Sequence, residues 1–262
     1  MTMQPISLYS DLSHDNYPEY LFWVGCAGAA DRRYQKVIQA FVKILQHCSI
    51  NFGILGEEES CNGDPARRAG NEMLFQMQAL QLIETFNRYN IKQIITCCPH
   101  CFNTFKNEYP DLGGNYEVVS HVEFIVQLID KGKLVIDQSV FKDKVVTYHD
   151  PCYLGRGNGI YDAPRKALDA LGVKRVELKE NRSKSLCCGA GGAQLFKEND
   201  PGTTEINLQR TEQVLESGAS VVATACPFCM LMLTDGLQTK QANNETASVG
   251  NKDIAELIAA AL

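Results

Sequence analysis

The sequence predicts an α/β fold made of two tandem Rossmann-like units with parallel sheets, which are related by internal duplication. The first observation behind this prediction is a set of cysteines whose spacing in the first half of the chain recurs in the second half. The second observation is that short apolar runs alternate with stretches of helical periodicity in each half. Such alternation is typical of parallel sheets with right-handed crossovers.

The repeated cysteine spacing involves nine of the eleven cysteines in the 262-residue chain. The first series advances in steps of 35, 37 and 3 residues, and the second in steps of 36, 38 and 3 residues. The members of the two series are Cys26, Cys61, Cys98 and Cys101, then Cys152, Cys188, Cys226 and Cys229, with Cys187 directly before Cys188. Matching members are about 127 residues apart, which is the length expected of one unit.

The first predicted unit covers residues 21–130 and follows an N-terminal arm of residues 1–20. Apolar runs rich in aromatic and β-branched residues predict its strands at 20–25, 50–55, 91–96 and 118–119. Apolar residues at helical spacing predict its helices at 35–48, 67–89 and 122–128.

The second predicted unit covers residues 145–262, and residues 131–144 form the linker that precedes it. Its strands are predicted at 145–148, 176–178 and 221–224, and its helices at 163–171, 204–216 and 254–262. Each Cys-Pro-x-Cys sequence is expected to open a helix, because proline suits the first helical turn.

The cysteines follow the predicted strands, and this placement has a geometric consequence. The carboxyl ends of parallel strands meet at one edge of a sheet, where open α/β sheets bind their ligands. Cysteines that are 35 to 38 residues apart are therefore expected to gather at that edge. The helix starts at each Cys-Pro-x-Cys also favour anionic sulfur, since their backbone N–H groups are free.

Composition and charge exclude several classes of protein. Hydrophobic residues make up 45% and charged residues 21%, which is typical of a globular chain and not of a disordered or fibrous one. The formal net charge of −6 argues against nucleic acid as the main partner, since phosphates attract basic surfaces. No apolar run reaches the roughly 18–20 residues that span a bilayer.

The expected location is the cytoplasm, with any membrane association made through a partner. The first residues are polar and lack the basic and apolar regions of a signal peptide. Structural disulfides are not expected in a reducing compartment, and eleven cysteines cannot all pair.

Four kinds of site compete to explain the cysteines. A zinc ribbon built from the two Cys-x-x-Cys pairs is disfavoured because the pairs are 125 residues apart. A redox dithiol does not require the other cysteines of each series. Zinc within each half stays open, since four thiolates make a tetrahedral site. Iron–sulfur ligation accounts for clustered thiolates in a reducing compartment and is the favoured interpretation.

Three longer motifs resemble a known family. They are Cys-Asn-Gly-Asp-Pro-Ala-Arg-Arg-Ala-Gly-Asn-Glu from Cys61, His-Asp-Pro-Cys-Tyr-Leu-Gly-Arg from His149, and Cys-Cys-Gly-Ala-Gly-Gly from Cys187. Both halves resemble the cysteine-rich "CCG" domain, which occurs in the catalytic subunit of heterodisulfide reductase and in related iron–sulfur oxidoreductases. The resemblance extends from about Leu21 to the C-terminus.

In the second half, the resemblance implies a noncubane [4Fe–4S] cluster held by five cysteines. These cysteines are Cys152, Cys187, Cys188, Cys226 and Cys229.

In the first half, only four cysteines match the family's pattern, and they are Cys26, Cys61, Cys98 and Cys101. Ser60 is taken to stand where the first cysteine of the Cys-Cys pair belongs, and Cys97 is additional. Four ligands suit a second, ordinary [4Fe–4S] cluster or a zinc ion, whereas a noncubane cluster needs Ser60, Asp64 or Cys97 as a further ligand. The sequence leaves this choice open, with an iron–sulfur cluster favoured over zinc, and zinc over a site that binds nothing.

The function that the resemblance implies is an iron–sulfur electron-transfer or catalytic subunit of an oxidoreductase complex, similar to heterodisulfide reductase. Its acceptor is expected to be a disulfide or a quinone. The sequence contains neither a Gly-x-Gly-x-x-Gly flavin motif nor a compact ferredoxin motif. We therefore expect a flavoprotein, ferredoxin-like or membrane-associated partner to supply the electrons. The rival interpretation is a zinc-stapled binding or regulatory protein without redox activity.

His149 and His121 are the candidate catalytic residues, because each lies near a predicted strand end at the cysteine-bearing edge. Each can donate a hydrogen bond to sulfur or a proton to a departing thiolate. The simpler interpretation is that both are hydrogen-bonded core histidines.

Overall fold

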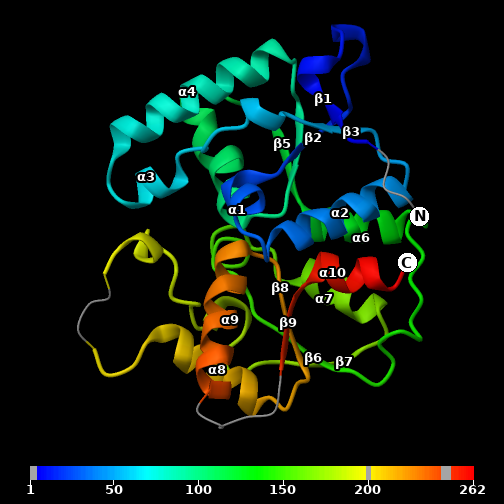
Figure 1. Cartoon of the computed structure of the whole chain (residues 1–262), viewed down its shortest axis with the longest axis vertical. Coiled ribbons are helices and arrows are strands. Elements are labelled where there is room, and N and C mark those ends of the chain that lie inside the picture. Colours follow the sequence, from blue (N-terminus) through cyan, green and yellow to red (C-terminus); the bar gives the residue numbers. More distant parts are fainter. Residues whose placement is uncertain (1–4, 199–201, 243–248) are drawn as a thin grey trace. The chain divides into compact units, whose positions relative to one another are not determined.

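The computed structural model describes residues 5–198, 202–242 and 249–262 of the chain (Figure 1). The chain forms two compact units, Met1–Leu134 and Val135–Leu262. Each unit contains one parallel sheet with helices, so the predicted α/β class with two parallel sheets is confirmed.

The sheet of the first unit has five strands in the order β1-β3-β2-β4-β5. The strands are β1 Ser7–Leu8, β2 Tyr20–Trp23, β3 Phe52–Ile54, β4 Gln93–Thr96 and β5 Glu117–Ser120. In its centre, Trp23 at the end of β2 lies opposite Thr96 at the end of β4. The short β1 comes from the segment that the sequence suggests is an arm, and it pairs with β3 at the sheet edge.

The sheet of the second unit has four strands in the order β7-β6-β8-β9. The strands are β6 Val145–Tyr148, β7 Lys174–Val176, β8 Val221–Thr224 and β9 Gly250–Asp253. This order repeats β3-β2-β4-β5 of the first unit, as internal duplication requires. Strand β9 is not among the predicted strands, because Gly-Asn-Lys-Asp carries no apolar pattern.

The helices of the first unit are α1 Gly25–Ala30, α2 Gln35–His47, α3 Asp64–Arg68, α4 Glu72–Arg88, α5 Pro99–Asn103 and α6 His121–Asp130. The prediction of one helix over 67–89 is wrong, since the chain turns between α3 and α4. Gly70 adopts φ +84°, and the side-chain oxygen of Asn71 accepts a hydrogen bond from Leu74 N at 3.1 Å. A left-handed glycine followed by an asparagine cap ends one helix and starts the next.

The helices of the second unit are α7 Asp162–Ala170, α8 Ile206–Glu216, α9 Pro227–Ala242 and α10 Ile254–Ala260. α8 packs against α9, and α7 packs against α10. Both α5 and α9 begin at the proline of a Cys-Pro-x-Cys sequence, which confirms that prediction.

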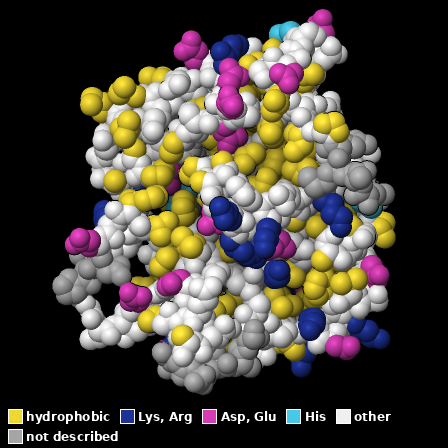
Figure 2. All heavy atoms as spheres, viewed as in Figure 1, with side chains coloured by type: hydrophobic (Ala, Val, Ile, Leu, Met, Phe, Trp, Pro, Cys, Tyr) yellow, Lys and Arg dark blue, Asp and Glu magenta, His cyan; other side chains and the backbone are white. Residues whose placement is uncertain are grey.

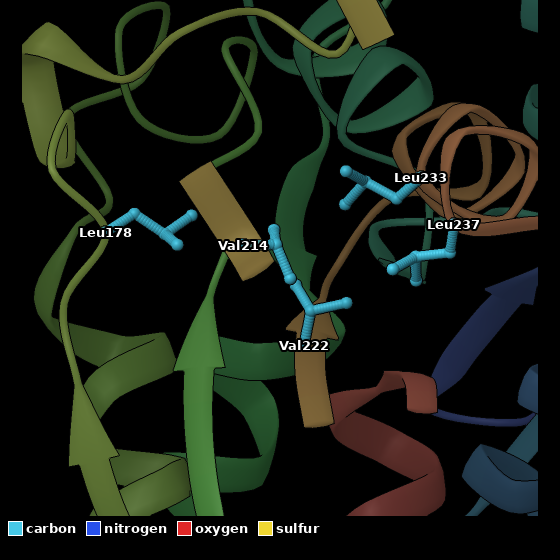
Figure 3. Packing of buried hydrophobic residues seen from close by; sticks show 5 residues of the cluster. All are labelled: Leu178, Val214, Val222, Leu233 and Leu237. Atoms are coloured by element: carbon cyan, nitrogen blue, oxygen red, sulfur yellow. The ribbon is translucent and has the colours of Figure 1, made fainter. Parts of the chain in front are cut away.

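The core of the second unit is formed where α8, α9 and β8 meet (Figure 3). Its buried side chains are Leu178, Val214, Val222, Leu233 and Leu237. Burying such side chains contributes about 1.5–3 kcal/mol each. This packing holds α8 and α9 together beside the carboxyl ends of β6 and β8, which the cysteines follow.

The surface carries charges of both signs, and hydrophobic side chains gather over α4 (Figure 2). Met73, Met77 and Leu80 of that helix are 74%, 62% and 52% exposed. Within the described ranges, no helix combines the length and the apolar character needed to cross a membrane.

Candidate metal centres

The cysteines lie at the point in each parallel sheet where the strand order reverses. The reversal lies between β2 and β4 in the first unit and between β6 and β8 in the second. Cys26 and Cys98 follow the first pair of strands, and Cys152 and Cys226 follow the second pair. Open α/β sheets bind ligands in the crevice at this point, beyond the carboxyl ends of the strands.

The five cysteines of the second unit lie together. Cys188, Cys226 and Cys229 form one buried cluster, and the half-buried Cys187 packs against it. A hydrogen bond joins Cys187 to Cys152 and brings in the fifth thiol. All eleven cysteines of the chain lie in described residues, and none of them takes part in a disulfide.

Hydrogen bonds between sulfur atoms shift the pKa values of the thiols in this cluster. The pKa of Cys187 is held far below its usual range by hydrogen bonds from Cys152 and Cys188. The Gly189 N–H also donates to Cys187 Sγ at 3.3 Å. The same hydrogen bond to Cys187, with burial, raises the pKa of Cys188 to about 12. Thiols this crowded suit a soft metal core that replaces their protons.

His149 reaches the same cluster. One of its ring nitrogens and the Sγ atoms of Cys188 and Cys229 all lie within 4.8 Å of one another. The guanidinium of Arg210 donates from Nε to His149 Nδ1 at 2.9 Å. Burial, and then the charge of Arg210, hold the pKa of His149 well below its usual range. His149 is therefore neutral, and its one proton is on Nε2.

Arg210 is a buried residue that the sequence analysis did not identify. It is fully buried in α8, and burial lowers its pKa to about 10. Besides His149, its guanidinium donates to Glu180 O, Gln213 Oε1 and Ser185 Oγ. It thus fixes both the tautomer and the orientation of the histidine ring.

A pocket of about 800 Å³ lies beside the second cluster of cysteines. Its lining includes Leu186, Cys187, Gln194, Ile206, Asn207 and Met232. This size and this mixture of apolar and polar side chains suit a small organic molecule. Cys187 connects the pocket to the buried thiols.

The four matching cysteines of the first unit also approach one another. Cys98 and Cys101 are buried, and a hydrogen bond with Cys98, together with burial, raises the pKa of Cys101 well above its usual range. Cys26 keeps part of its surface exposed. Burial of the rest of its thiol, and then the neighbouring Cys98 and Cys61, raise its pKa to about 11.

Asp64 accepts hydrogen bonds from side chains of α3 and α5. Its carboxylate accepts hydrogen bonds from His100 Nδ1 at 3.0 Å and from Arg68 Nε at 3.1 Å. Burial opposes its ionisation, but His100 and then Arg68 hold its pKa below the usual value. These bonds occupy the carboxylate that the sequence analysis considered as a further ligand.

The loops that follow β3 and β7 contain the same turn. Gly63 has φ +88° and donates from its N–H to Cys61 Sγ at 3.5 Å. Gly189 has φ +97° and donates in the same way to Cys187 Sγ at 3.3 Å. Both positions require glycine, because other residues rarely adopt these angles. Cys61 therefore corresponds to Cys187, the first cysteine of the pair.

It follows that Asn62 stands where the second unit has Cys188. The interpretation that places Ser60 at the missing cysteine is wrong, and Ser60 is exposed. Asn62 and Cys188 are each 4% exposed. The sequence carries a signal for this match, because the step from Cys26 to Cys61 and the step from Cys152 to Cys187 are both 35 residues, and a glycine lies two residues after Cys61 and after Cys187.

Cys97 occupies the position of Ala225 in the second unit, directly before the Cys-Pro-x-Cys sequence. Both residues are buried, and the backbone oxygen of Cys97 accepts a hydrogen bond from the Tyr34 hydroxyl at 3.0 Å. This placement favours a core position for Cys97 beside the thiols.

His121, the second histidine candidate, begins α6, and its ring contacts Phe41 of α2 at 5.8 Å between centroids. It is 1% exposed, in the packing between two helices. This setting favours the core interpretation of His121.

Glu59 is another residue that the sequence analysis did not identify. Its carboxylate accepts hydrogen bonds from the backbone N–H groups of Val24 and Gly25, just before Cys26. Burial raises its pKa to about 7, against the effect of these two donors. Glu59 thus connects the Cys61 loop to the turn that carries Cys26.

Comparison with known proteins gives matches in both units. The family model described as "Cysteine-rich domain" (CCG) matches residues 20–106 and 146–234. The chain is 44% identical to the "Probable iron-sulfur-binding oxidoreductase FadF" of Bacillus subtilis, over 92% of the chain and 34% of that protein. It is 41% identical to the "EtfAB:quinone oxidoreductase" of Syntrophomonas wolfei, over 92% of the chain and 34% of that protein.

An archaeal relative is similar over a larger share of its own length. It is one of the subunits of the dihydromethanophenazine:CoB–CoM heterodisulfide reductase of Methanosarcina barkeri. The two sequences are 31% identical over 96% of this chain and 61% of the archaeal protein. The chain thus spans about a third of the two bacterial relatives and less than two thirds of the archaeal one.

Proposed function

The chain belongs to the cysteine-rich domain (CCG) family, and from this premise we propose that it is an iron–sulfur subunit of an oxidoreductase complex. The observation that carries the proposal is the convergence of five thiols in the second unit beside a pocket. An iron–sulfur cluster, when bound, supplies one-electron transfer.

The donor set fits such a cluster. Every side chain proposed as a ligand is a thiol, and soft thiolates select iron–sulfur clusters or zinc. In the second unit the proposed ligands, for a noncubane [4Fe–4S] cluster, are Cys152, Cys187, Cys188, Cys226 and Cys229. In the first unit the proposed ligands, for a second [4Fe–4S] cluster, are Cys26, Cys61, Cys98 and Cys101.

Three groups next to the proposed ligands of the second unit can donate hydrogen bonds or hold a donor in place. His149 has a ring nitrogen near the sulfur atoms of Cys188 and Cys229, and its N–H, on Nε2, is the hydrogen-bond donor of the ring. Arg210 keeps that ring neutral and fixed. The Gly189 N–H stabilises negative charge on Cys187. We propose His149 as the candidate catalytic residue, since its neutral N–H can stabilise negative charge on a product thiolate or on a reduced quinone oxygen by a hydrogen bond.

The acceptor is proposed to be a disulfide or a quinone that enters the pocket beside Cys187. The names of the relatives support these two classes, since one is a quinone oxidoreductase and another belongs to a heterodisulfide reductase. Leu186, Ile206 and Met232 offer the apolar contacts that a quinone ring or an organic disulfide needs.

A partner is proposed to deliver the electrons, and its expected class is a flavoprotein, a ferredoxin-like protein or a membrane-associated redox subunit. The relatives' names again support this class, because one names EtfAB and another names a subunit of a larger reductase. Any association with a membrane would then come through that partner.

Reduction and reoxidation of the reconstituted chain test this function. We expect the visible absorption of the anaerobically reconstituted protein to bleach on reduction and to return when a quinone or a disulfide is added. Buffer without acceptor is the control. A chain that stays colourless after reconstitution contradicts the proposal and favours the zinc-stapled alternative. A chain that bleaches but is reoxidised by neither acceptor contradicts the proposed acceptor classes.

A further inference from the structure

The central strands pair in the same way in both sheets. Each residue of one site can therefore be matched to a residue of the other site. In the first unit, Trp23 lies opposite Thr96, which is two residues before Cys98. In the second unit, Tyr148 lies opposite Ala223, so the next residue, His149, lies opposite Thr224, two residues before Cys226. Trp23 therefore occupies the position of His149.

The triangle of His149, Cys188 and Cys229 in the second unit thus has a counterpart. Its counterpart in the first unit consists of Trp23, Asn62 and Cys101. Compared with the second unit, the first unit has an indole in place of the imidazole and a carboxamide in place of one thiol. Both replacements bring a side-chain N–H donor and neither brings a thiol.

The indole of Trp23 lies next to the Cys101 thiol. A β-carbon added at Gly25 would lie 3.6 Å from Trp23 Nε1 and 3.6 Å from Cys101 Sγ, so both atoms border the same small space. The indole N–H favours the ionised form of Cys101, against the hydrogen bond with Cys98 and the burial that raise its pKa.

The carboxamide of Asn62 has a fixed orientation. Its Oδ1 accepts a hydrogen bond from Asp64 N at 3.1 Å, which leaves Nδ2 as the group with donors to spare. The Asn62 backbone oxygen accepts a hydrogen bond from the Tyr109 hydroxyl at 3.1 Å. Burial, and then the nearby thiols of Cys101 and Cys61, raise the pKa of Tyr109, which places this group of residues beside the thiols.

Both nitrogen atoms are buried, and neither has an acceptor in regular hydrogen-bond geometry among the residues that the structure describes. Trp23 is 1% exposed and Asn62 is 4% exposed. A buried donor left unsatisfied is destabilising, because it has lost its hydrogen bonds to water. These two donors occupy the positions of His149 and Cys188 in the second unit. They therefore point to an acceptor that binds between the thiols of the first unit.

We infer that Trp23 Nε1 and Asn62 Nδ2 donate hydrogen bonds to sulfur atoms of a cluster held by four thiolates in the first unit, with Asn62 in place of a fifth thiolate. This inference rests on the proposed function. Hydrogen bonds to sulfur stabilise the added negative charge of the reduced state, so they raise the reduction potential of the cluster. The first site would then differ from the second in both ligand number and potential.

Trp23→Phe in the full-length, reconstituted chain tests the indole. The ring keeps its apolar packing and loses the N–H. We expect unchanged iron content and a reduction equilibrium about tenfold less favourable, which is about 59 mV for one electron. Phe105→Leu is the control, because Phe105 packs on Trp23 at 4.9 Å and has no N–H. An unchanged potential in Trp23→Phe, or an equal shift in Phe105→Leu, overturns the role of the indole.

Asn62→Cys and Ser60→Cys test the fifth position. We expect Asn62→Cys to supply a fifth thiolate and to move the electron paramagnetic resonance signal of the first unit toward that of the second. Ser60→Cys adds its thiol at an exposed position, so the signal should stay unchanged. A change in Ser60→Cys alone would overturn the assignment of Asn62.

The proposed function fails in a different way, namely if the wild-type chain takes up no iron on reconstitution. In that case Co²⁺ is added instead of iron, so that the inference can still be tested. The inference then predicts that Trp23→Phe shifts the sulfur-to-cobalt absorption of the first unit. An identical cobalt spectrum in wild type and variant overturns the inference as well.

Discussion

Cys188→Ser is expected to remove iron from the second unit and to abolish electron transfer to the acceptor, while the first unit keeps its metal. Cys188 is 4% exposed and exchanges hydrogen bonds with both Cys187 and Cys229. A serine hydroxyl is far less acidic than a thiol and is a poor ligand for soft metals. The site should therefore lose iron instead of shifting in potential. Iron content, electron paramagnetic resonance and turnover measure the effect.

Cys48→Ser is the matched control for this variant. Cys48 belongs to neither repeated series, and its thiol donates to the backbone oxygen of Lys133 at 3.4 Å. Iron content and turnover should equal those of the wild type. Full activity in Cys188→Ser, or turnover lost only when Cys61 or Cys98 is changed, would place the chemistry in the first unit.

Arg165→Met is expected to lower the free energy of unfolding of the second unit by about 3–5 kcal/mol. The Arg165 guanidinium is 3% exposed and donates to both carboxylate oxygens of Asp150, at 2.7 and 2.9 Å. Asp150 is equally buried and lies between His149 and Cys152. Methionine fills the space but leaves a buried carboxylate without its charged partner, although the Arg182 backbone N–H still donates to it at 2.8 Å. Urea unfolding of the variant and the wild type measures the loss.

Arg175→Met is the control for this change, because it removes a guanidinium from the same unit at a more exposed position. Arg175 pairs with Asp169 at 2.8 Å, and the aspartate side chain is 53% exposed. Exposed ion pairs contribute up to about 1 kcal/mol. Equal losses in the two variants would mean that burial of the Arg165–Asp150 pair has no special effect on stability.

The sequence was sufficient to predict the α/β class and the gathering of cysteines in each half. The prediction worked because apolar runs such as 221–224 end directly at Cys-Pro-x-Cys sequences, so local patterns report strand ends. Parallel strands then bring those ends to one edge, whatever the length of the crossovers. The break at Gly70 was also open to prediction, because Gly-Asn is a helix-ending and helix-starting pair.

Features set by tertiary contact could not be predicted. The bond from Arg210 to His149 spans 61 positions, and nothing in the local sequence marks it. The equivalence of Asn62 and Cys188, in contrast, was open to prediction, because Cys26 to Cys61 and Cys152 to Cys187 are equal steps of 35 residues and both loops continue to a glycine; the φ angles and N–H···S bonds agree with it. The match of Trp23 to His149 can be seen in the sequence, since each lies three residues before the first cysteine of its series, but the placement of the Trp23 indole beside the Cys101 thiol depends on tertiary contact.

The measurement that tests the central claim most directly is iron, acid-labile sulfide and zinc analysis of the anaerobically purified and reconstituted chain. We predict roughly four to eight irons per chain, from one or two four-iron clusters, with a similar amount of sulfide. The nine cysteines of the two series are the basis of this number. Zinc without iron after anaerobic reconstitution would contradict the claim.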